Sequence, residues 1–247
     1  MTLFVSCPAA SPHLGDFVTP SRRRLLPTTG LWAADNEAFS HFDPDRFRRM
    51  LDAFARAATK PVFVTAPDVV CDHHATADRW VEWCREFHAR NLPRAFALQN
   101  GIEGMPPEHA LPWGNLEAIF IGGDTAFKFC PWVRECVRLA KRLGKWVHMG
   151  RVNSVRRLNY ARLIGCDSCD GSGMARFRDR VLSPMLRELP QQQLALFRAQ
   201  PGLRTSASQP KLRLKASVMA LPPEALQKSL QRLVPPLNPQ SQIVWTL

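Results

Sequence analysis

The sequence predicts an α/β fold built around a parallel sheet, and three observations lead to that class. Short apolar runs alternate with segments that have the periodicity of amphipathic helices. Most of these runs are apolar almost throughout, as strands buried on both faces are. Polar residues follow nearly every run at the point where a strand would end. With 247 residues and 45% hydrophobic content, the chain is long enough for one sizeable core.

Seven apolar runs have the length of strands. They cover Leu3–Cys7, Leu31–Ala34, Pro61–Ala66, Ala95–Gln99, Ala118–Ile121, Trp146–Met149 and Gly165–Cys169.

Three helices are predicted between the runs. Asp43 is placed to cap the first, with Pro44 at its first position. The buried faces of the three helices repeat at helical spacing. They consist of Phe47, Met50, Leu51, Phe54 and Ala58, then of Trp80, Cys84 and Phe87, and then of Val133, Cys136, Val137, Ala140 and Leu143. Gly144 is expected to end the third helix.

The polar residues after the runs are the candidate site, because reactive groups in parallel α/β folds lie at the carboxyl ends of the strands. They are Asp35-Asn36-Glu37, Asp68, Gln99-Asn100-Gly101, Gly122-Gly123-Asp124, Arg151 and Asp170. Asp170 is the first catalytic candidate, since glycines and small residues around it suit close approach of a substrate to the backbone. Single members such as Asn36 or Asp124 are explained equally well as cap or turn residues.

The charge of the chain points to a polyanionic partner or to solubility. The net charge is +12, from 33 Lys and Arg against 21 Asp and Glu. Residues 186–247 carry +6 of it, with a Pro- and Gln-rich composition that predicts a basic extension after a barrel-like domain at 1–185. A solvated tail and an arm that follows phosphates both fit this extension.

The sequence lacks both a membrane-spanning stretch and a disulfide framework, and these two features indicate the cellular compartment. No stretch has the ~20 apolar residues of a spanning helix, so a soluble, cytoplasmic protein without membrane contact is expected. The seven cysteines are scattered and do not form a disulfide framework, so we expect them to be reduced.

Five segments, in order, resemble motifs of the queuine tRNA-ribosyltransferases, the tRNA-guanine transglycosylases, and more closely of their DNA-directed relatives, the DeoxyPurine in DNA protein A family. Asp35-Asn36-Glu37-Ala38-Phe39 resembles Asp-Ser-Gly-Gly-Phe, Leu98-Gln99-Asn100-Gly101 resembles Val-Gln-Gly-Gly, and Ile121-Gly122-Gly123-Asp124 resembles the Gly-Gly-Leu segment. His148-Met149-Gly150 is similar to Leu-Met-Gly, and Gly165 to Asp170 is similar to Gly-Ile-Asp-Met-Phe-Asp, with Arg176 at the place of the Arg in Pro-Thr-Arg. The resemblance covers roughly residues 3 to 180, and the collinear order makes it moderately specific.

The resemblance implies a (β/α)₈ barrel that exchanges guanine in a nucleic acid for a 7-deazaguanine base, such as 7-cyano-7-deazaguanine. By this analogy Asp170 is the nucleophile that forms a glycosyl ester, and Asp35 is the general acid and base. The expected polymer is DNA, with tRNA as the alternative. No cofactor is implied, and a homodimer is left open.

The same resemblance implies which residues bind the base and the strand. Asp68, Gln99, Gly122 and Gly123 would recognise the guanine edge, and Phe39 and Met149 would sandwich the ring, although both also suit core packing. Arg176, Arg151 and Arg178 would bind phosphates, with a solvated basic loop as the competing explanation.

Three departures from the family pattern stand out. The Cys-x-Cys-x-x-Cys zinc site of the tRNA enzymes has no counterpart, since Cys169 is the last cysteine, so no metal is expected. Glu37-Ala38 replaces a Gly-Gly pair, and Asp124 replaces an apolar residue at the expected pocket wall. These changes predict altered base selectivity or lost activity.

Two further functions and the closure of the barrel stay open at this point. A metal-dependent hydrolase would use Asp68, Asp72, His73, His74 and His148. A noncatalytic nucleic-acid-binding barrel would lack covalent chemistry. The eighth strand is expected at 212–218 or at 242–246, unless the barrel closes near Val181.

Overall fold

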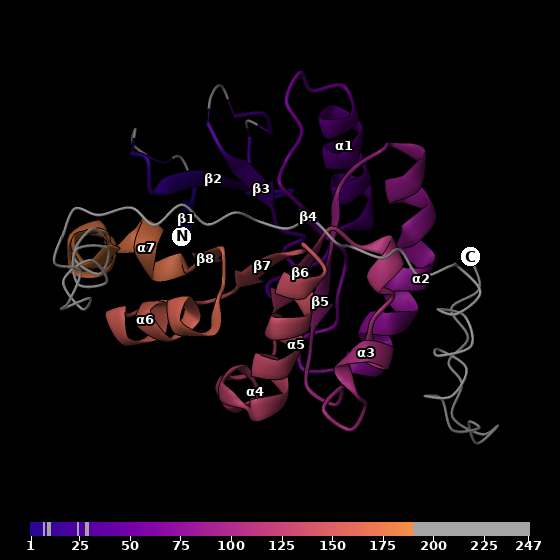
Figure 1. Cartoon of the computed structure of the whole chain (residues 1–247). Coiled ribbons are helices and arrows are strands. Elements are labelled where there is room, and N and C mark those ends of the chain that lie inside the picture. Colours follow the sequence, from indigo (N-terminus) through magenta and orange to yellow (C-terminus); the bar gives the residue numbers. More distant parts are fainter. Residues whose placement is uncertain (7, 9–10, 24, 28–29, 190–247) are drawn as a thin grey trace, which may run out of the picture. The chain divides into compact units, whose positions relative to one another are not determined.

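The computed structural model describes residues 1–189 except 7, 9–10, 24 and 28–29. Eight parallel strands close into a barrel in the order β1 to β8, with helices around it (Figure 1). The strands are β1 (Thr2–Val5), β2 (Leu14–Val18), β3 (Trp32–Ala34), β4 (Val64–Thr65), β5 (Arg94–Leu98), β6 (Ala118–Ile121), β7 (Trp146–Met149) and β8 (Ser168–Asp170). The predicted α/β class and a closed barrel of parallel strands are therefore confirmed.

The strand that the sequence analysis missed is β2, the second in chain order. It pairs with β1 through Leu3 and Leu14 and with β3 through Phe17 and Ala33. The barrel then closes where β1 pairs with β8, with Phe4 opposite Asp170. Closure near Val181 was wrong, because that segment is the π-helical turn η2 (Arg178–Leu182). Residues 212–218 and 242–246 lie outside the described part of the chain.

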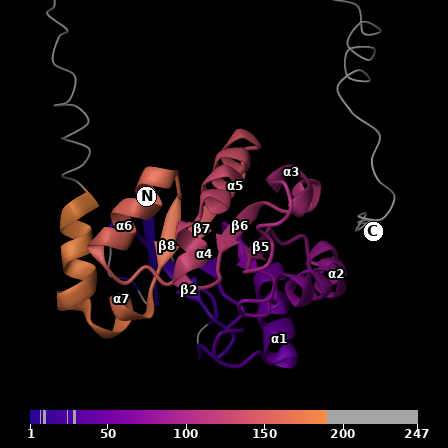
Figure 2. The same ribbon diagram turned by 90° about the horizontal axis from the view of Figure 1, so that it is seen from below.

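The helices cover the barrel from β3 onward. They are α1 (Pro44–Ala55), α2 (His73–Ala89), α3 (Pro107–Ala110), α4 (Thr125–Phe129), α5 (Pro131–Arg142), α6 (Val155–Ile164) and α7 (Ser172–Arg176), with the short turn η1 (Trp113–Asn115) before β6. Helices α1 and α2 lie side by side, as Figures 1 and 2 both show. Within the described residues no helix separates β1 from β2 or β2 from β3, so these connections depart from the regular (β/α)₈ pattern.

The three predicted helices form for the reasons that the sequence suggested. The Asp43 side chain accepts hydrogen bonds from the first turn of α1, and Pro44 is its first residue. Gly144 follows α5 with a φ of +68°, a conformation that favours glycine. Ala58, expected on the buried face of α1, lies beyond its end and is exposed.

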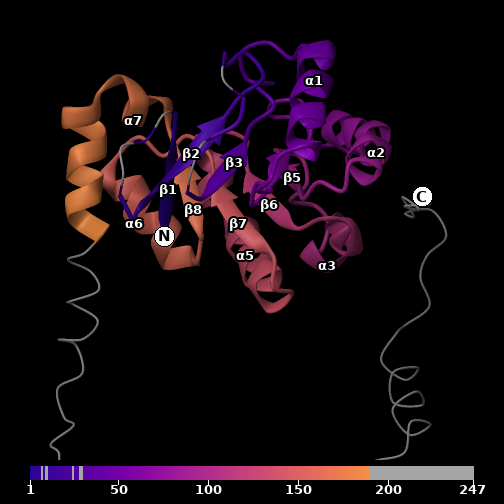
Figure 3. The ribbon, with the colours of Figure 1, turned by 90° about the horizontal axis from the view of Figure 1, so that it is seen from above.

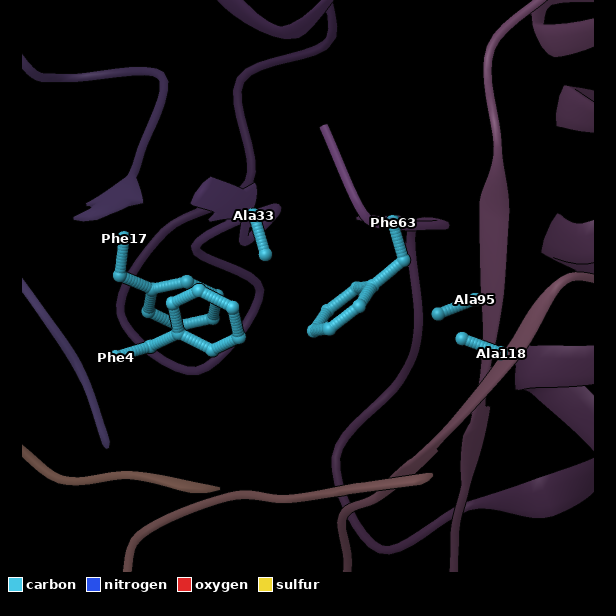
Figure 4. Close-up of a cluster of buried hydrophobic side chains, with 6 residues drawn as sticks. All are labelled: Phe4, Phe17, Ala33, Phe63, Ala95 and Ala118. Atoms are coloured by element: carbon cyan, nitrogen blue, oxygen red, sulfur yellow. The ribbon is translucent and has the colours of Figure 1, made fainter. Parts of the chain in front are cut away.

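Aromatic rings fill the centre of the barrel. Phe4 and Phe17 stack with centroids 5.8 Å apart, and Phe63 meets Phe4 edge to face at 6.1 Å (Figure 4). Small residues complete the cluster, namely Ala33, Ala95 and Ala118. Gly15 makes room for this packing, since a Cβ there would lie 2.4 Å from the Phe4 ring. The barrel interior is therefore a packed core that closes the bottom of any site at the strand ends.

After β8 the chain forms α7 and η2 and continues as a helix over 183–189 (Figure 3). This helix crosses the boundary expected between 185 and 186, and the predicted basic extension lies outside the described residues from 190 on. Among the described residues no helix combines the length and apolarity that crossing a membrane requires. The six described cysteines are free thiols.

Candidate functional site

A pocket of about 460 Å³ opens at the carboxyl ends of the barrel strands. Nine of the eleven residues to which the family resemblance assigns a role line it. These are Asp35, Phe39, Asp68, Gln99, Gly122, Gly123, Arg151, Asp170 and Arg176. They come from six different strand ends and from α7, so the parallel order of the barrel is what brings them together.

Met149 and Arg178 are the two of these eleven residues that do not line this pocket. Met149 is 1% exposed, and it follows His148, whose ring packs on the aromatic cluster inside the barrel. Because successive side chains of a strand point to opposite faces, Met149 points to the helix layer. Phe120, which pairs with His148 in the sheet, is one of the apolar residues that line the pocket. Arg178 is exposed on η2.

Asp35 follows β3, and the pKa of its carboxyl is far above that of an ordinary aspartate. Burial, together with the nearby negative charges of Asp170 and Asp68, raises the pKa of this carboxyl to about 8. At neutral pH the side chain therefore carries its proton. Asp35 can donate that proton to a bound group and take one back, which is the property that acid–base catalysis near pH 7 requires.

Asp170, the last residue of β8, presents its carboxylate to the pocket with 19% of the side chain exposed. One oxygen, Oδ1, lies 3.1 Å from Nε2 of His148 and accepts a long hydrogen bond of 3.3 Å from the Arg151 N–H. Within the described residues no hydrogen bond reaches the other oxygen, Oδ2. The two carboxyl groups of the pocket, Asp35 and Asp170, therefore have different surroundings.

Asp68 and Gln99 form a fixed polar wall. Asp68 accepts from Asn36 Nδ2 at 2.7 Å and from Gln99 Nε2 at 2.5 Å, while its burial raises the pKa of the carboxyl against the lowering effect of these bonds. The Gln99 Oε1 accepts from the N–H groups of Cys71 and Gly123, at 2.9 and 2.8 Å. The Gly123 N–H, expected to face a ligand, is therefore used within the protein, and one N–H of the Gln99 amide is left for a ligand.

The glycines near the site serve the packing of neighbouring loops. A Cβ at Gly171 would lie 2.3 Å from Asn153 Oδ1, and one at Gly122 would lie 2.5 Å from Gln99 Nε2. The sequence analysis expected a substrate to approach the backbone closely at Gly171. In the structure the loop after β7, with Asn153, occupies that space. Asp124 caps α4 by accepting from the Phe127 N–H at 2.8 Å and does not line the pocket, so its expected place at the pocket wall was wrong.

Lys128 is a pocket residue that the sequence analysis missed. Its Nζ donates to the carbonyl oxygens of Ile121 and Gly150, both at 3.0 Å, and so joins the ends of β6 and β7. Burial lowers the pKa of this ammonium to about 8, against the opposing charge of Asp170. A single lysine in a short apolar helix carries no motif, so no sequence signal could have identified it.

The five residues of the metal-dependent hydrolase alternative do not gather around one point. Asp72 caps α2, and His148 lies inside the barrel at 0% exposure. The part of the chain that the structure describes contains no group of three or more His, Cys, Asp and Glu side chains able to hold a metal ion. The ligand set on which that alternative depends is not assembled.

No protein-family model matches the chain, and no curated protein is similar to it in sequence. The resemblance to the guanine transglycosylases therefore rests on the five motifs and their order.

We expect Gly122→Ala to displace Gln99 and to destabilise the protein by about 2 kcal/mol, because the added methyl group overlaps the Gln99 amide and the Leu98 carbonyl oxygen. The free energy of unfolding from urea titration measures this loss. Gly114→Ala is the matched control, since nothing lies within 4 Å of a Cβ there, and it should change stability by less than about 0.5 kcal/mol. Equal effects of the two substitutions would contradict the packing described for Gln99.

Proposed function

We propose that this protein exchanges guanine in a nucleic acid, with DNA as the first candidate polymer, for a 7-deazaguanine base. The observation that carries the proposal is the pair Asp35 and Asp170 in one pocket with different surroundings. The Asp35 carboxyl holds a proton at neutral pH, whereas the Asp170 carboxylate accepts hydrogen bonds at only one of its two oxygens. Base exchange through a covalent intermediate needs one proton carrier and one nucleophile, and these two groups supply both roles.

The reaction would proceed in two displacements. Asp170 Oδ2 attacks C1′ of the sugar, the bond from C1′ to the guanine nitrogen breaks, and Asp35 gives its proton to the departing base. A glycosyl ester then joins Asp170 to the strand. The incoming base gives its nitrogen proton to Asp35, the nitrogen attacks C1′, and the ester bond breaks to restore the Asp170 carboxylate.

Recognition of a flat base is supported by the polar wall and the aromatic residues of the pocket. Gln99 keeps one amide N–H free for a ligand, and Phe39 is 65% exposed at the pocket edge. Arg151 and Arg176 are exposed side chains that line the same opening. Guanidinium groups at the rim are suited to bind the phosphates that flank an extruded nucleotide.

The experiment that tests this function uses the full chain with two polymers. Guanine-containing DNA and unmodified tRNA are each incubated with 7-cyano-7-deazaguanine, and the digested nucleosides are analysed by mass spectrometry. A modified deoxynucleoside supports the DNA assignment, and a modified ribonucleoside identifies tRNA as the polymer. If neither polymer is modified and no protein–nucleic-acid adduct forms, the proposal is wrong and the noncatalytic barrel becomes the better description.

A further inference from the structure

A chain of three hydrogen bonds runs through the barrel interior and ends on Asp170. Nε1–H of Trp146 donates to Ser168 Oγ at 2.8 Å, Ser168 Oγ lies 2.9 Å from Nδ1 of His148, and Nε2 of His148 lies 3.1 Å from Asp170 Oδ1. All four residues belong to β7 and β8. His148 and Ser168 are both 0% exposed, so water does not compete for these bonds.

The direction of each bond follows from the charges of its partners. Burial lowers the pKa of His148 against the raising effect of Asp170, so the ring is neutral and carries one N–H. That proton belongs on Nε2, because a lone pair there would face the Asp170 carboxylate. Nδ1 is then the acceptor, and the Ser168 hydroxyl donates to it while accepting from Trp146.

Aromatic rings hold the imidazole in place on several sides. The His148 ring lies 5.5 Å from Phe17 in a stacked arrangement, 5.2 Å from Phe63 and 4.8 Å from Phe120, measured between centroids. The titratable groups that act on it are Asp170 and Lys128, the second of which lowers the pKa of the ring. The ring can therefore neither rotate freely nor gain a proton easily.

Ser168, His148 and Asp170 are the residue types of the serine hydrolase triad, but here the carboxylate faces the pocket and the serine is buried, the opposite of the arrangement in those enzymes. Ser168 is the fully buried end, and the carboxylate of Asp170 is the end that faces the pocket. A nucleophile must reach the substrate, so the hydroxyl cannot play that part and the carboxylate can.

We propose that His148 is a positioning residue for Asp170: its Nε2–H holds Oδ1, Ser168 and Trp146 hold the other side of the ring, and Oδ2 is thereby the attacking oxygen. This inference rests on the proposed function, because it assigns the nucleophilic atom of that reaction. Because hydrogen bonds hold the carboxylate at Oδ1, Oδ2 stays directed at the pocket. A reacting atom misplaced by about 1 Å can lower the rate about 10²-fold.

The test compares three variants in single-turnover formation of the protein–DNA adduct. His148→Leu removes the donor and should lower the rate about 10²-fold while leaving the affinity for DNA unchanged. His148→Gln can place an amide N–H where Nε2 lies and should restore about tenfold of that loss. Ser168→Ala removes the hydrogen bond that holds the far side of the ring, so it should lower the rate about tenfold. ¹⁵N NMR of the imidazole should then show an Nδ1 without its hydrogen bond, while Nε2, which faces Asp170, keeps its proton.

Phe63→Leu is the control for packing, since it changes a ring that touches His148 but removes no hydrogen bond of the chain. A rate loss in Phe63→Leu as large as that in His148→Leu would overturn the proposal, as would an unchanged rate in His148→Leu. If His148→Leu does not fold, Ser168→Ala decides: an unchanged rate of adduct formation in that variant would overturn the proposal.

Failure of the proposed function gives a different result from failure of this inference. A wild-type protein that forms no adduct with either polymer would contradict the base exchange. The NMR experiment on the unliganded protein would still show whether Nε2 of His148 carries the proton and whether Ser168 donates to Nδ1. Exchange by the wild-type protein with a ring in the Nδ1–H form would overturn the positioning role alone.

Discussion

Asp170→Asn is expected to abolish base exchange, with a loss of about 10⁴-fold or more, while binding of nucleic acid persists. The amide cannot form the glycosyl ester, but its oxygen can still accept from His148, so the end of β8 should keep its geometry. Mass spectrometry of the digested nucleosides measures the exchange, and electrophoresis under denaturing conditions detects the adduct.

Two further variants make this result specific. An asparagine at 170 precedes Gly171 and can deamidate back to aspartate, so Asp170→Ala is measured beside it. Asp124→Asn is the matched control, because Asp124 follows β6 but caps α4 outside the pocket, and asparagine is an equally good cap. Exchange that persists in Asp170→Ala, or that is lost equally in Asp124→Asn, would sink the assignment of the nucleophile.

Asp35→Asn is expected to stop turnover and at the same time to stabilise the protein. An amide cannot carry the proton between the two bases, which predicts a loss of about 10²–10⁴-fold in the exchange rate. The pKa of Asp35 is raised in the folded state to about 8, so folding opposes its ionisation. Removing the carboxyl relieves that penalty, by on the order of 3 kcal/mol at pH 8 once screening by pocket water is allowed for.

The pH dependence of this stabilisation has a definite sign. A raised folded-state pKa means that the native protein binds the proton more tightly than the unfolded chain, so wild-type stability falls as the pH rises from about 4 to about 8. The advantage of Asp35→Asn should be absent near pH 4, grow up to pH 8 and stay constant above it. Thermal unfolding across this range measures it, with Glu37→Gln as the control from the same pocket. An inactive variant that is also destabilised at pH 8 would contradict this account.

Seven of the eight strands were predictable because each is a compact apolar run. Two of them, β6 and β7, have the predicted bounds. The exception, β2, contains Gly15 and Asp16 at its centre, and no helix pattern precedes it to mark a crossover. Asp16 is tolerated there because it pairs with Arg22 at 2.7 Å, a contact that only the folded chain reveals.

The site was predictable where chemistry follows from a position at a strand end. Asp35, Asp68, Gln99 and Asp170 each follow or end a strand, and the barrel order alone brings them together. Sequence could not show which hydrogen bonds are already used, as at the Gly123 N–H.

The positions of Met149 and Lys128 could also not be predicted from the sequence, because each is determined by residues that are near only in the folded chain. Met149 was expected either to stack on the base or to pack in the core, and it is 1% exposed next to His148, whose ring packs on the aromatic cluster inside the barrel. Lys128 reaches the pocket by folding back from α4 onto the ends of two strands.

The contact between Arg151 and Phe39 couples the phosphate-binding role proposed for Arg151 to the stacking role proposed for Phe39. The guanidinium carbon of Arg151 lies 4.2 Å from the centroid of the Phe39 ring, and both side chains line the pocket. Arg151 thus acts as an internal competitor for the ring face, and displacing it costs about 0.5–1 kcal/mol. In a pocket that takes both a phosphate and a base, a phosphate that draws the guanidinium away uncovers the ring. Strand binding would then strengthen base stacking by about two- to fivefold, the factor that corresponds to this free energy.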